Sequence, residues 1–93
     1  MAFSDLILIK VYYGDRIVRF GMNRNELRFD QLVLEIRRQH EIDDNIQFRM
    51  TYLDDEGDNV QLRRTENLLH AVTLPGVSSL LKIRLVPEQA RER

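Results

Sequence analysis

The chain has 93 residues, no cysteine and a formal net charge of −1, which results from 14 Lys and Arg against 15 Asp and Glu. Since a domain usually takes about 100 to 200 residues, the chain has room for one small domain. The lack of cysteine excludes disulfide scaffolds and thiol catalysis and fits a reducing compartment, while the near-zero charge argues against nucleic acid as a partner.

The N-terminal part of the chain predicts a β-hairpin. Residues 6–13 are β-branched and aromatic, Gly14-Asp15 is a turn signal, and residues 17–20 form a second strand. In the first strand a period of two places Lys10 on one face with Leu6, Leu8 and Tyr12, and places Ile7, Ile9, Val11 and Tyr13 on the other. This apolar run is too short to span a bilayer, and no basic segment precedes it as in a signal peptide.

The next segment predicts a helix and a third strand. Apolar residues recur at three and four positions from Phe29, which is typical of an amphipathic helix that ends before Asp43. Asp30 either caps this helix or interacts favourably with the positive end of its dipole. Residues 46–52 alternate between apolar and polar and predict a strand.

The C-terminal part predicts two strands separated by a helix. An acidic turn with Gly57 leads into a short strand at residues 60–62, and Thr65 is the expected N-cap of a helix over 66–72. The last predicted strand, residues 80–86, ends at Pro87. We expect a domain over residues 6–86, with a disordered N-terminus at 1–5 and a polar tail at 87–93.

The predicted order is strand, strand, helix, strand, strand, helix, strand. This order is typical of an α+β fold of the ubiquitin-like β-grasp type with a mixed sheet.

The sequence contains no pattern that favours catalysis. His40 and His70 lack metal-ligand spacing and are interpreted as structural, and the glycines are isolated, so no phosphate-binding loop is present. Asp54, Glu56 and Asp58 alternate like calcium ligands, but an EF-hand loop would need Gly where Asn59 stands and Glu where Thr65 stands. We therefore expect no enzyme, no cofactor, no bound metal and no small-molecule substrate.

The near-zero net charge hides a segregation of charge along the chain. Residues 1–40 carry seven basic and five acidic side chains (+2), residues 41–58 carry one and seven (−6), and residues 59–93 carry six and three (+3). Four carboxylates fall within residues 54–58, where their mutual repulsion destabilises an isolated domain unless cations relieve it. The simpler alternative is a solvated turn, since runs of charge usually are solvated.

A basic patch is expected on the hairpin. Lys10 lies in the middle of the first strand, with Arg19 on the neighbouring strand and Arg16 beside them. The simpler alternative here is a lysine whose stem covers the sheet and whose ammonium reaches water.

The segment Tyr-Leu-Asp-Asp-Glu-Gly-Asp-Asn-Val-Gln-Leu at residues 52–62 resembles the acidic signature of Phox and Bem (PB-1) domains. Lys10 stands where that family places a first-strand lysine. The chain departs from related sequences at Val18, where they often have an arginine, and at Asn67, where they commonly have an acid. The resemblance covers about residues 6–86.

The resemblance implies the class of PB-1 domain that carries both an acidic and a basic face. It implies an acidic face of Asp54, Asp55, Glu56, Asp58 and Glu66, and a basic face of Lys10, Arg19 and Arg16. Such domains associate head to tail into homo-oligomers or filaments, or pair with another PB-1 domain, as scaffolds. We therefore expect a cytoplasmic interaction module without a membrane partner. The alternative is a β-grasp domain that binds a small GTPase or another partner through the basic hairpin without self-assembly.

Overall fold

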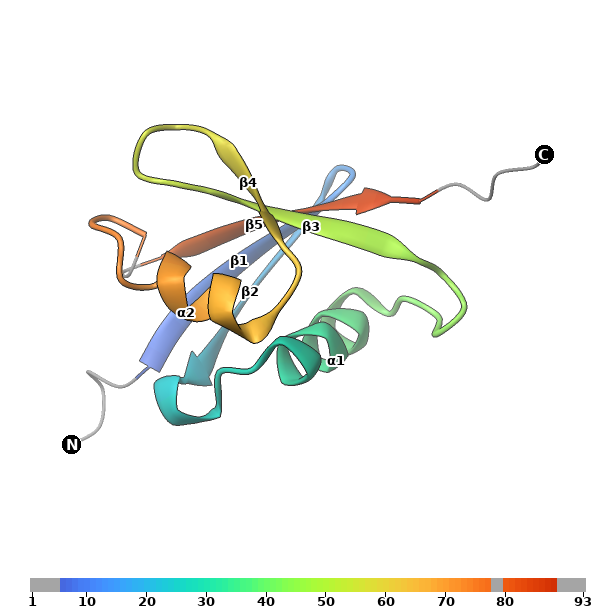
Figure 1. The fold of residues 1–93 in the computed structure, drawn as a ribbon. Helices are drawn as coiled ribbons and strands as arrows, with labels where there is room; N and C mark the ends of the chain where they lie inside the picture. The colour runs from blue at the N-terminus through green and yellow to red at the C-terminus, as the bar shows by residue number, and fades with distance from the viewer. Residues whose placement is uncertain (1–5, 78–79, 89–93) are drawn as a thin grey trace.

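The computed structural model describes residues 6–77 and 80–88 (Figure 1). Its elements follow the predicted order, with one added turn of 3-10 helix after the second strand. They are β1 (Leu6–Tyr13), β2 (Arg16–Asn23), η2 (Arg24–Glu26), α1 (Phe29–His40), β3 (Phe48–Leu53), β4 (Asn59–Leu62), α2 (Thr65–Ala71) and β5 (Leu81–Pro87).

The strands form one mixed sheet in the order β2-β1-β5-β3-β4. The central strands β1 and β5 are parallel, and the other three pairings are antiparallel. This arrangement confirms the predicted ubiquitin-like β-grasp fold of the α+β class.

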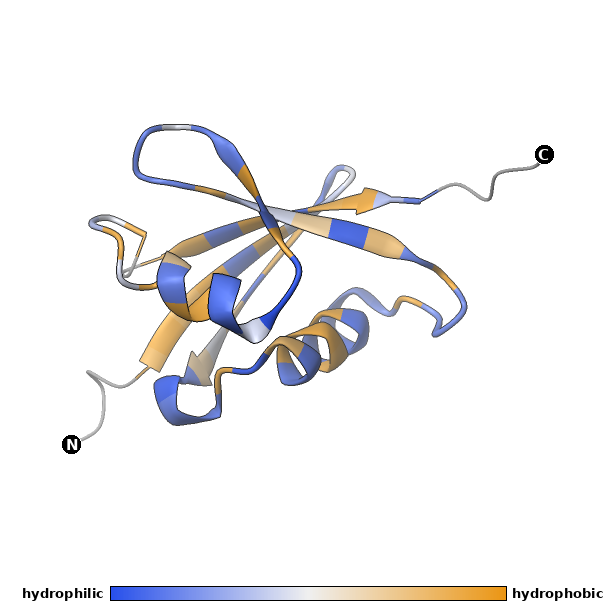
Figure 2. Ribbon diagram, in the orientation of Figure 1, coloured by the Kyte–Doolittle hydropathy of each residue, from blue (hydrophilic) through white to orange (hydrophobic). Residues whose placement is uncertain are grey.

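Both helices lie on the same face of the sheet and cover its apolar side (Figure 1). Ile7 and Ile9 of β1 are fully buried there, and Ile83 of β5, which pairs with Val11, is buried beside them. Hydrophobic and hydrophilic residues alternate along β5 and β3 (Figure 2), because successive side chains of a strand point to opposite faces. The face opposite the helices carries the charged residues of the strands together with exposed apolar side chains such as Leu8 and Ile17.

The bounds of four strands differ from the sequence expectation. The second strand runs from Arg16 to Asn23 instead of 17–20, and the fourth begins one residue earlier, at Asn59. The third strand begins at Phe48 because a turn closed by Ile46 N–H donating to the Asp43 carbonyl, 3.1 Å, precedes it. The last strand includes Pro87, and Glu88 N–H donates to the Gln47 carbonyl at 3.0 Å. Sheet pairing thus continues into the predicted tail. The expectations for residues 1–5 and 89–93 lie outside the described residues.

The helix starts depend on contacts that are not local. Thr65 is the first residue of α2 and does not cap it; its Oγ1 accepts a hydrogen bond from Phe29 N–H, the first amide of α1, at 2.9 Å. Arg28 occupies the N-cap position of α1, so Asp30 lies within the first turn, where its charge favours the helix dipole. The start of α2 is instead closed by Asn67, whose side-chain oxygen accepts from Arg63 and Arg64 N–H.

His40 is a core residue with 1% of its surface exposed. Its Nε2 lies 3.2 Å from the Val11 carbonyl, and since a carbonyl only accepts, Nε2 carries the proton. The ring packs edge-on against Tyr13, with 5.5 Å between centroids. These contacts join the end of α1 to β1 and agree with a structural histidine.

Among the described residues, neither helix combines the length and hydropathy needed to cross a bilayer.

Candidate functional site

The acidic turn, residues 54–58, connects the paired ends of β3 and β4. Asp54 N–H donates to the Asp58 carbonyl at 2.9 Å, and Gly57 N–H donates to the Asp54 carbonyl at 3.2 Å. Gly57 has a φ of +85°, a conformation that side-chain-bearing residues rarely adopt. The glycine in this acidic sequence is therefore what allows the chain to reverse.

The side chain of Asp54 holds the turn from inside. Its Oδ1 accepts two backbone hydrogen bonds, from Glu56 N–H at 2.9 Å and Asp58 N–H at 2.8 Å. Asp54 is half-buried, whereas Glu56 and Asp58 are exposed. Asp54 thus has two roles, since it shapes the loop and also adds a negative charge to it.

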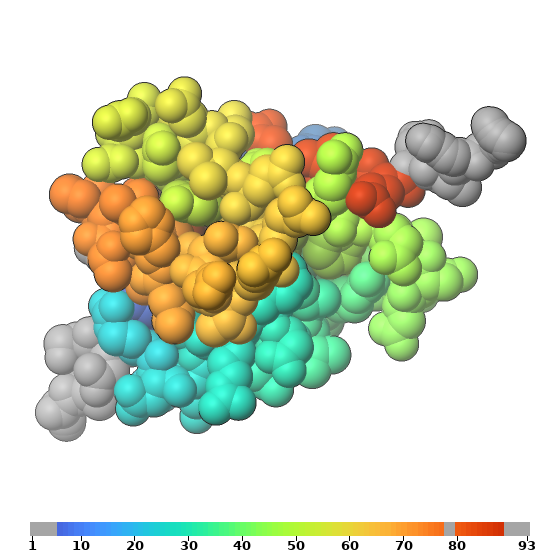
Figure 3. Space-filling model, viewed as in Figure 1, coloured from blue at the N-terminus to red at the C-terminus, as the bar shows by residue number. Residues whose placement is uncertain are grey.

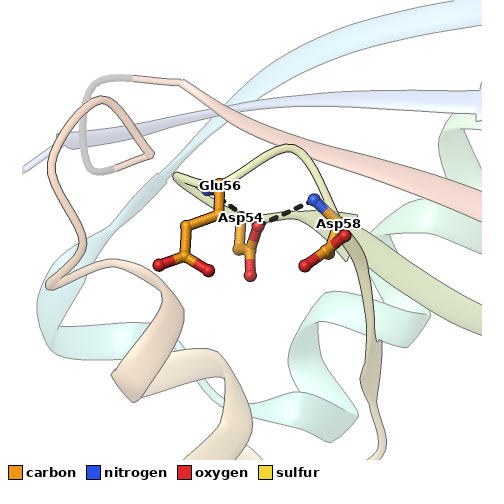
Figure 4. A group of neighbouring side chains, drawn as sticks. All are labelled: Asp54, Glu56 and Asp58. Atoms are coloured by element: carbon orange, nitrogen blue, oxygen red, sulfur yellow. Dashed lines mark hydrogen bonds between the residues drawn. The ribbon is translucent and has the colours of Figure 1, made fainter.

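Three carboxylates converge on one side of the turn. One oxygen each from Asp54, Glu56 and Asp58 lies within 4.8 Å of the others. Figure 4 shows all three side chains pointing to the side of the turn where α2 lies. Carboxylates this close repel one another, so the cluster favours a cation placed between them.

The two other predicted acidic residues lie outside this group of three. Asp55 is exposed in the same turn, and Glu66 lies in the first turn of α2, 3.7 Å from the Arg64 guanidinium. Burial, and then the charges of Asp54 and Asp55, raise the pKa of the buried Tyr52 hydroxyl at the end of β3. The negative potential of the turn therefore extends into the domain.

Lys10 lies at the centre of a row of cations that crosses three strands. It is directly opposite Arg19 of β2 on one side and Lys82 of β5 on the other. Residues directly opposite each other share a face of the sheet, so the three side chains project together. This face is the one opposite to the helices, because the neighbours Ile9 and Val11 point into the core.

Tyr12 lies two residues after Lys10 on the same face of β1, and its ring contacts two of the cations. The Lys10 ammonium lies 5.4 Å from the centroid of its ring, and the Arg84 guanidinium lies 5.8 Å from the same centroid. An aromatic face attracts cations, so Tyr12 holds two of them beside each other. We define the basic face as Lys10, Arg19, Lys82 and Arg84.

The strands place no acidic side chain on this face within the described residues. The outward positions of β1 to β5 carry five charged residues, all of them basic, namely the basic face and Arg49. Lys10, Arg19, Lys82 and Arg84 form no ion pair with any described acid. Their charge is therefore available to a partner.

The structure does not bring Arg16 to the basic face. Arg16 is opposite Tyr13, on the helix-bearing side of the sheet, and its Nη2 donates to the His40 carbonyl at 3.2 Å. In a strand, residues three apart point to opposite faces, which separates Arg16 from Arg19. Lys82 and Arg84 were not predicted, because their place depends on the parallel pairing of the first and last strands.

The two charged surfaces lie on opposite sides of the sheet. The carboxylates point to the side of α2, whereas the basic face is on the uncovered side (Figures 1 and 4). They therefore cannot neutralise each other within one copy of the chain. A β-grasp domain with two such surfaces belongs to the class of protein interaction domains that bind through complementary charge.

Comparison with known families gives a more particular assignment. The family model described as the PB1 domain matches residues 6–88. The chain belongs to the PB1 domain family, which confirms the family that the acidic signature indicated.

Two solved structures share this fold. The cryo-electron microscopy structure of the L-type filament of AtNBR1-PB1 is 24% identical, with a TM-score of 0.73 over 89% of this chain and 98% of that chain. The AtNBR1-PB1 domain is 22% identical, with a TM-score of 0.72 over 90% of this chain and 99% of that chain. The chain thus corresponds to nearly the whole length of both.

Proposed function

We propose that this domain associates head to tail, with the acidic turn of one copy on the basic face of the next. The observation that carries the proposal is the placement of the two surfaces on opposite sides of one sheet. Because the contacting surfaces differ, each association leaves one acidic and one basic surface free. Repetition then produces an open chain or helical filament, the form in which AtNBR1-PB1 was solved, or a closed ring where the rotation allows.

The proposed contact needs several charge pairs at once. An exposed ion pair contributes only about 0 to 1 kcal/mol, so Lys10 alone would not hold two copies together. Three converging carboxylates and four grouped cations provide several pairs over a small area. Both sets are fixed in place, the carboxylates by the turn and the cations by the sheet register, which lowers the entropy cost of binding.

Sedimentation velocity in low and high salt tests the proposal. The Debye length falls from about 30 Å at 0.01 M to about 3 Å at 1 M ionic strength, so we expect large species in low salt that dissociate in high salt. A chain that stays monomeric at high concentration and low salt would contradict self-association. Pairing with a different PB1 domain would then be the remaining form of the proposal.

The alternative function, binding of a small GTPase through the basic hairpin, would not need the acidic turn. Asp58→Asn distinguishes the two, because it removes one charge of the turn and leaves the hairpin unchanged. We propose further that the domain acts as a scaffold in the cytoplasm and does not itself catalyse a reaction.

A further inference from the structure

A groove of about 510 Å³ lies between α1 and the start of β3, at the end of β3 opposite to the acidic turn. Its floor is apolar and includes Val33 of α1 and Phe48 of β3, both partly buried against the core. In Figure 3 the surface is hollowed between the β3 region, drawn in green, and the yellow segment that leads from β4 to α2. The groove therefore combines an apolar floor with a lining that is mostly polar.

The groove lies beside a free edge of the sheet. On one side of β3, β5 pairs with residues 48–52, but on the other side β4 pairs only with residues 50–53. Among the described residues, Phe48 and Arg49 thus have no strand partner on the β4 side. The chain leaves the sheet after Leu62, where Arg63 and Arg64 N–H turn to the Asn67 side chain. An extended segment could add to this edge by backbone hydrogen bonds.

Three arginines line the groove. The Arg37 guanidinium stacks 4.8 Å from the centroid of the Phe48 ring and donates to the Asp43 carbonyl. Arg49 pairs with Glu88 at 3.5 Å, and that pair is largely exposed. Arg63 forms no ion pair with a described residue. The groove lining therefore has three positive charges and one negative charge, that of Glu88.

We propose that this groove binds an extended acidic peptide of another protein, with an aromatic or aliphatic side chain on the floor. Carboxylates before and after that anchor would pair with Arg49 and Arg63, and the peptide backbone would pair with the edge at Phe48 and Arg49. Arginine suits this task because its planar guanidinium forms two parallel hydrogen bonds to a carboxylate. The apolar floor selects for the anchor, and the arginines select for the charge around it.

The groove is separate from the proposed head-to-tail contact. It lies at the Phe48 end of β3, whereas the acidic turn follows Leu53, about 17 Å away at roughly 3.3 Å per residue. No residue of the groove lining belongs to the acidic turn or to the basic face, although Arg49 lies on the same side of the sheet as the basic face. Each copy in an assembly could therefore hold its own peptide, and the two kinds of binding can be tested independently.

The test is a selection from a phage library of random twelve-residue peptides on the Lys10→Ala/Asp58→Asn double variant. That target has neither charged surface intact, so self-association does not affect the result. We expect the enriched peptides to be acidic with one aromatic or aliphatic anchor. Their binding, measured by fluorescence polarisation, should weaken about tenfold when Arg63→Glu is added, since one exposed ion pair is lost and a repulsion between two carboxylates replaces it.

Arg24→Glu is the matched control, because Arg24 is exposed and outside the groove, and the change in net charge is the same. It should leave peptide affinity within about twofold. The proposal is overturned if the selected peptides are not acidic, or if both substitutions weaken binding equally. It is also overturned if amide NMR shifts on peptide binding fall at Arg19 and Lys82 instead of Phe48 and Arg49.

Discussion

Lys82 of β5 lies directly opposite Lys10 of β1 in the parallel pair at the centre of the sheet. Like charges directly opposite each other destabilise a sheet, so this placement costs stability. Neither lysine has an acidic partner among the described residues. An acidic surface brought by a partner would relieve the repulsion, and this relief adds to the binding free energy.

Replacing Lys82 with glutamine should therefore weaken self-association and slightly stabilise the isolated domain. We expect the dissociation constant to rise up to about fivefold, the value of one exposed ion pair. The free energy of unfolding should rise by a few tenths of a kcal/mol, about the size of one cross-strand pair effect. Sedimentation equilibrium and urea unfolding measure the two quantities.

Arg16→Gln is the control for Lys82→Gln. Like Lys82→Gln, it removes one positive charge, but Arg16 lies on the helix-bearing side of the sheet and contacts the His40 carbonyl. We expect unchanged association and a small loss of stability, the reverse of the Lys82 result. Equal weakening by both substitutions would mean that only net charge matters.

The two roles of Asp54 can be separated by two substitutions. Asp54→Asn keeps the oxygen that accepts from Glu56 and Asp58 N–H, so the turn should persist while one charge is lost. Asp54→Ala also removes the acceptor, and it should cost about 1 kcal/mol of unfolding free energy more than Asp54→Asn. Thermal unfolding measures this difference. Equal stability of the two variants would show that the side chain does not hold the turn.

Gly57→Ala should distort the acidic turn without a steric clash. A Cβ at Gly57 would meet nothing within 4 Å, so the cost comes only from its φ of +85°. We expect a loss of about 1 to 2 kcal/mol of stability, together with weaker association because the carboxylates no longer converge. Gly57→Asn should lose less, since asparagine tolerates positive φ better. Urea unfolding of the three chains gives the ranking.

Tyr52 should make the domain sensitive to alkali. Burial and the nearby Asp54 and Asp55 raise the pKa of its hydroxyl above the ordinary value of 10.0. A raised pKa means that the contribution of Tyr52 to stability is complete below pH 10 and decreases as the pH rises toward the folded-state pKa. Tyr52→Phe should lose this component, so the stability difference between the two chains should change above pH 10. A difference independent of pH from 7 to 11 would contradict the assignment.

The order of elements and the core face of each strand could be predicted from the sequence, because both follow from local hydrophobic period. Ile7, Ile9 and Val11 are buried and alternate with the less buried Leu8 and Lys10, in keeping with the period of two. The helix caps could not be predicted in this way. Thr65 has the sequence position of a cap for α2, but its hydroxyl accepts from Phe29, 36 residues earlier in the chain.

The acidic turn could be predicted from the sequence because its charges and its glycine are adjacent in sequence. Only part of the basic face, Lys10 and Arg19, could be predicted from the sequence. Lys10 and Arg19 belong to one hairpin, so their pairing follows from the turn, but Lys82 and Arg84 reach them only through the parallel contact of β5 with β1. The period of two along the second strand predicts that Arg16 and Arg19 lie on opposite faces of the sheet.

The most direct test of head-to-tail association mixes two variants, each with one surface disabled. Lys10→Ala lacks the centre of the basic face, and Asp58→Asn lacks part of the acidic cluster. By sedimentation velocity in low salt, at a concentration just high enough for the unsubstituted chain to assemble, we predict that each variant alone is mostly monomeric and that the mixture forms a 1:1 heterodimer that grows no further. A mixture that stays monomeric, or a single variant that still forms long assemblies, would contradict the proposed contact.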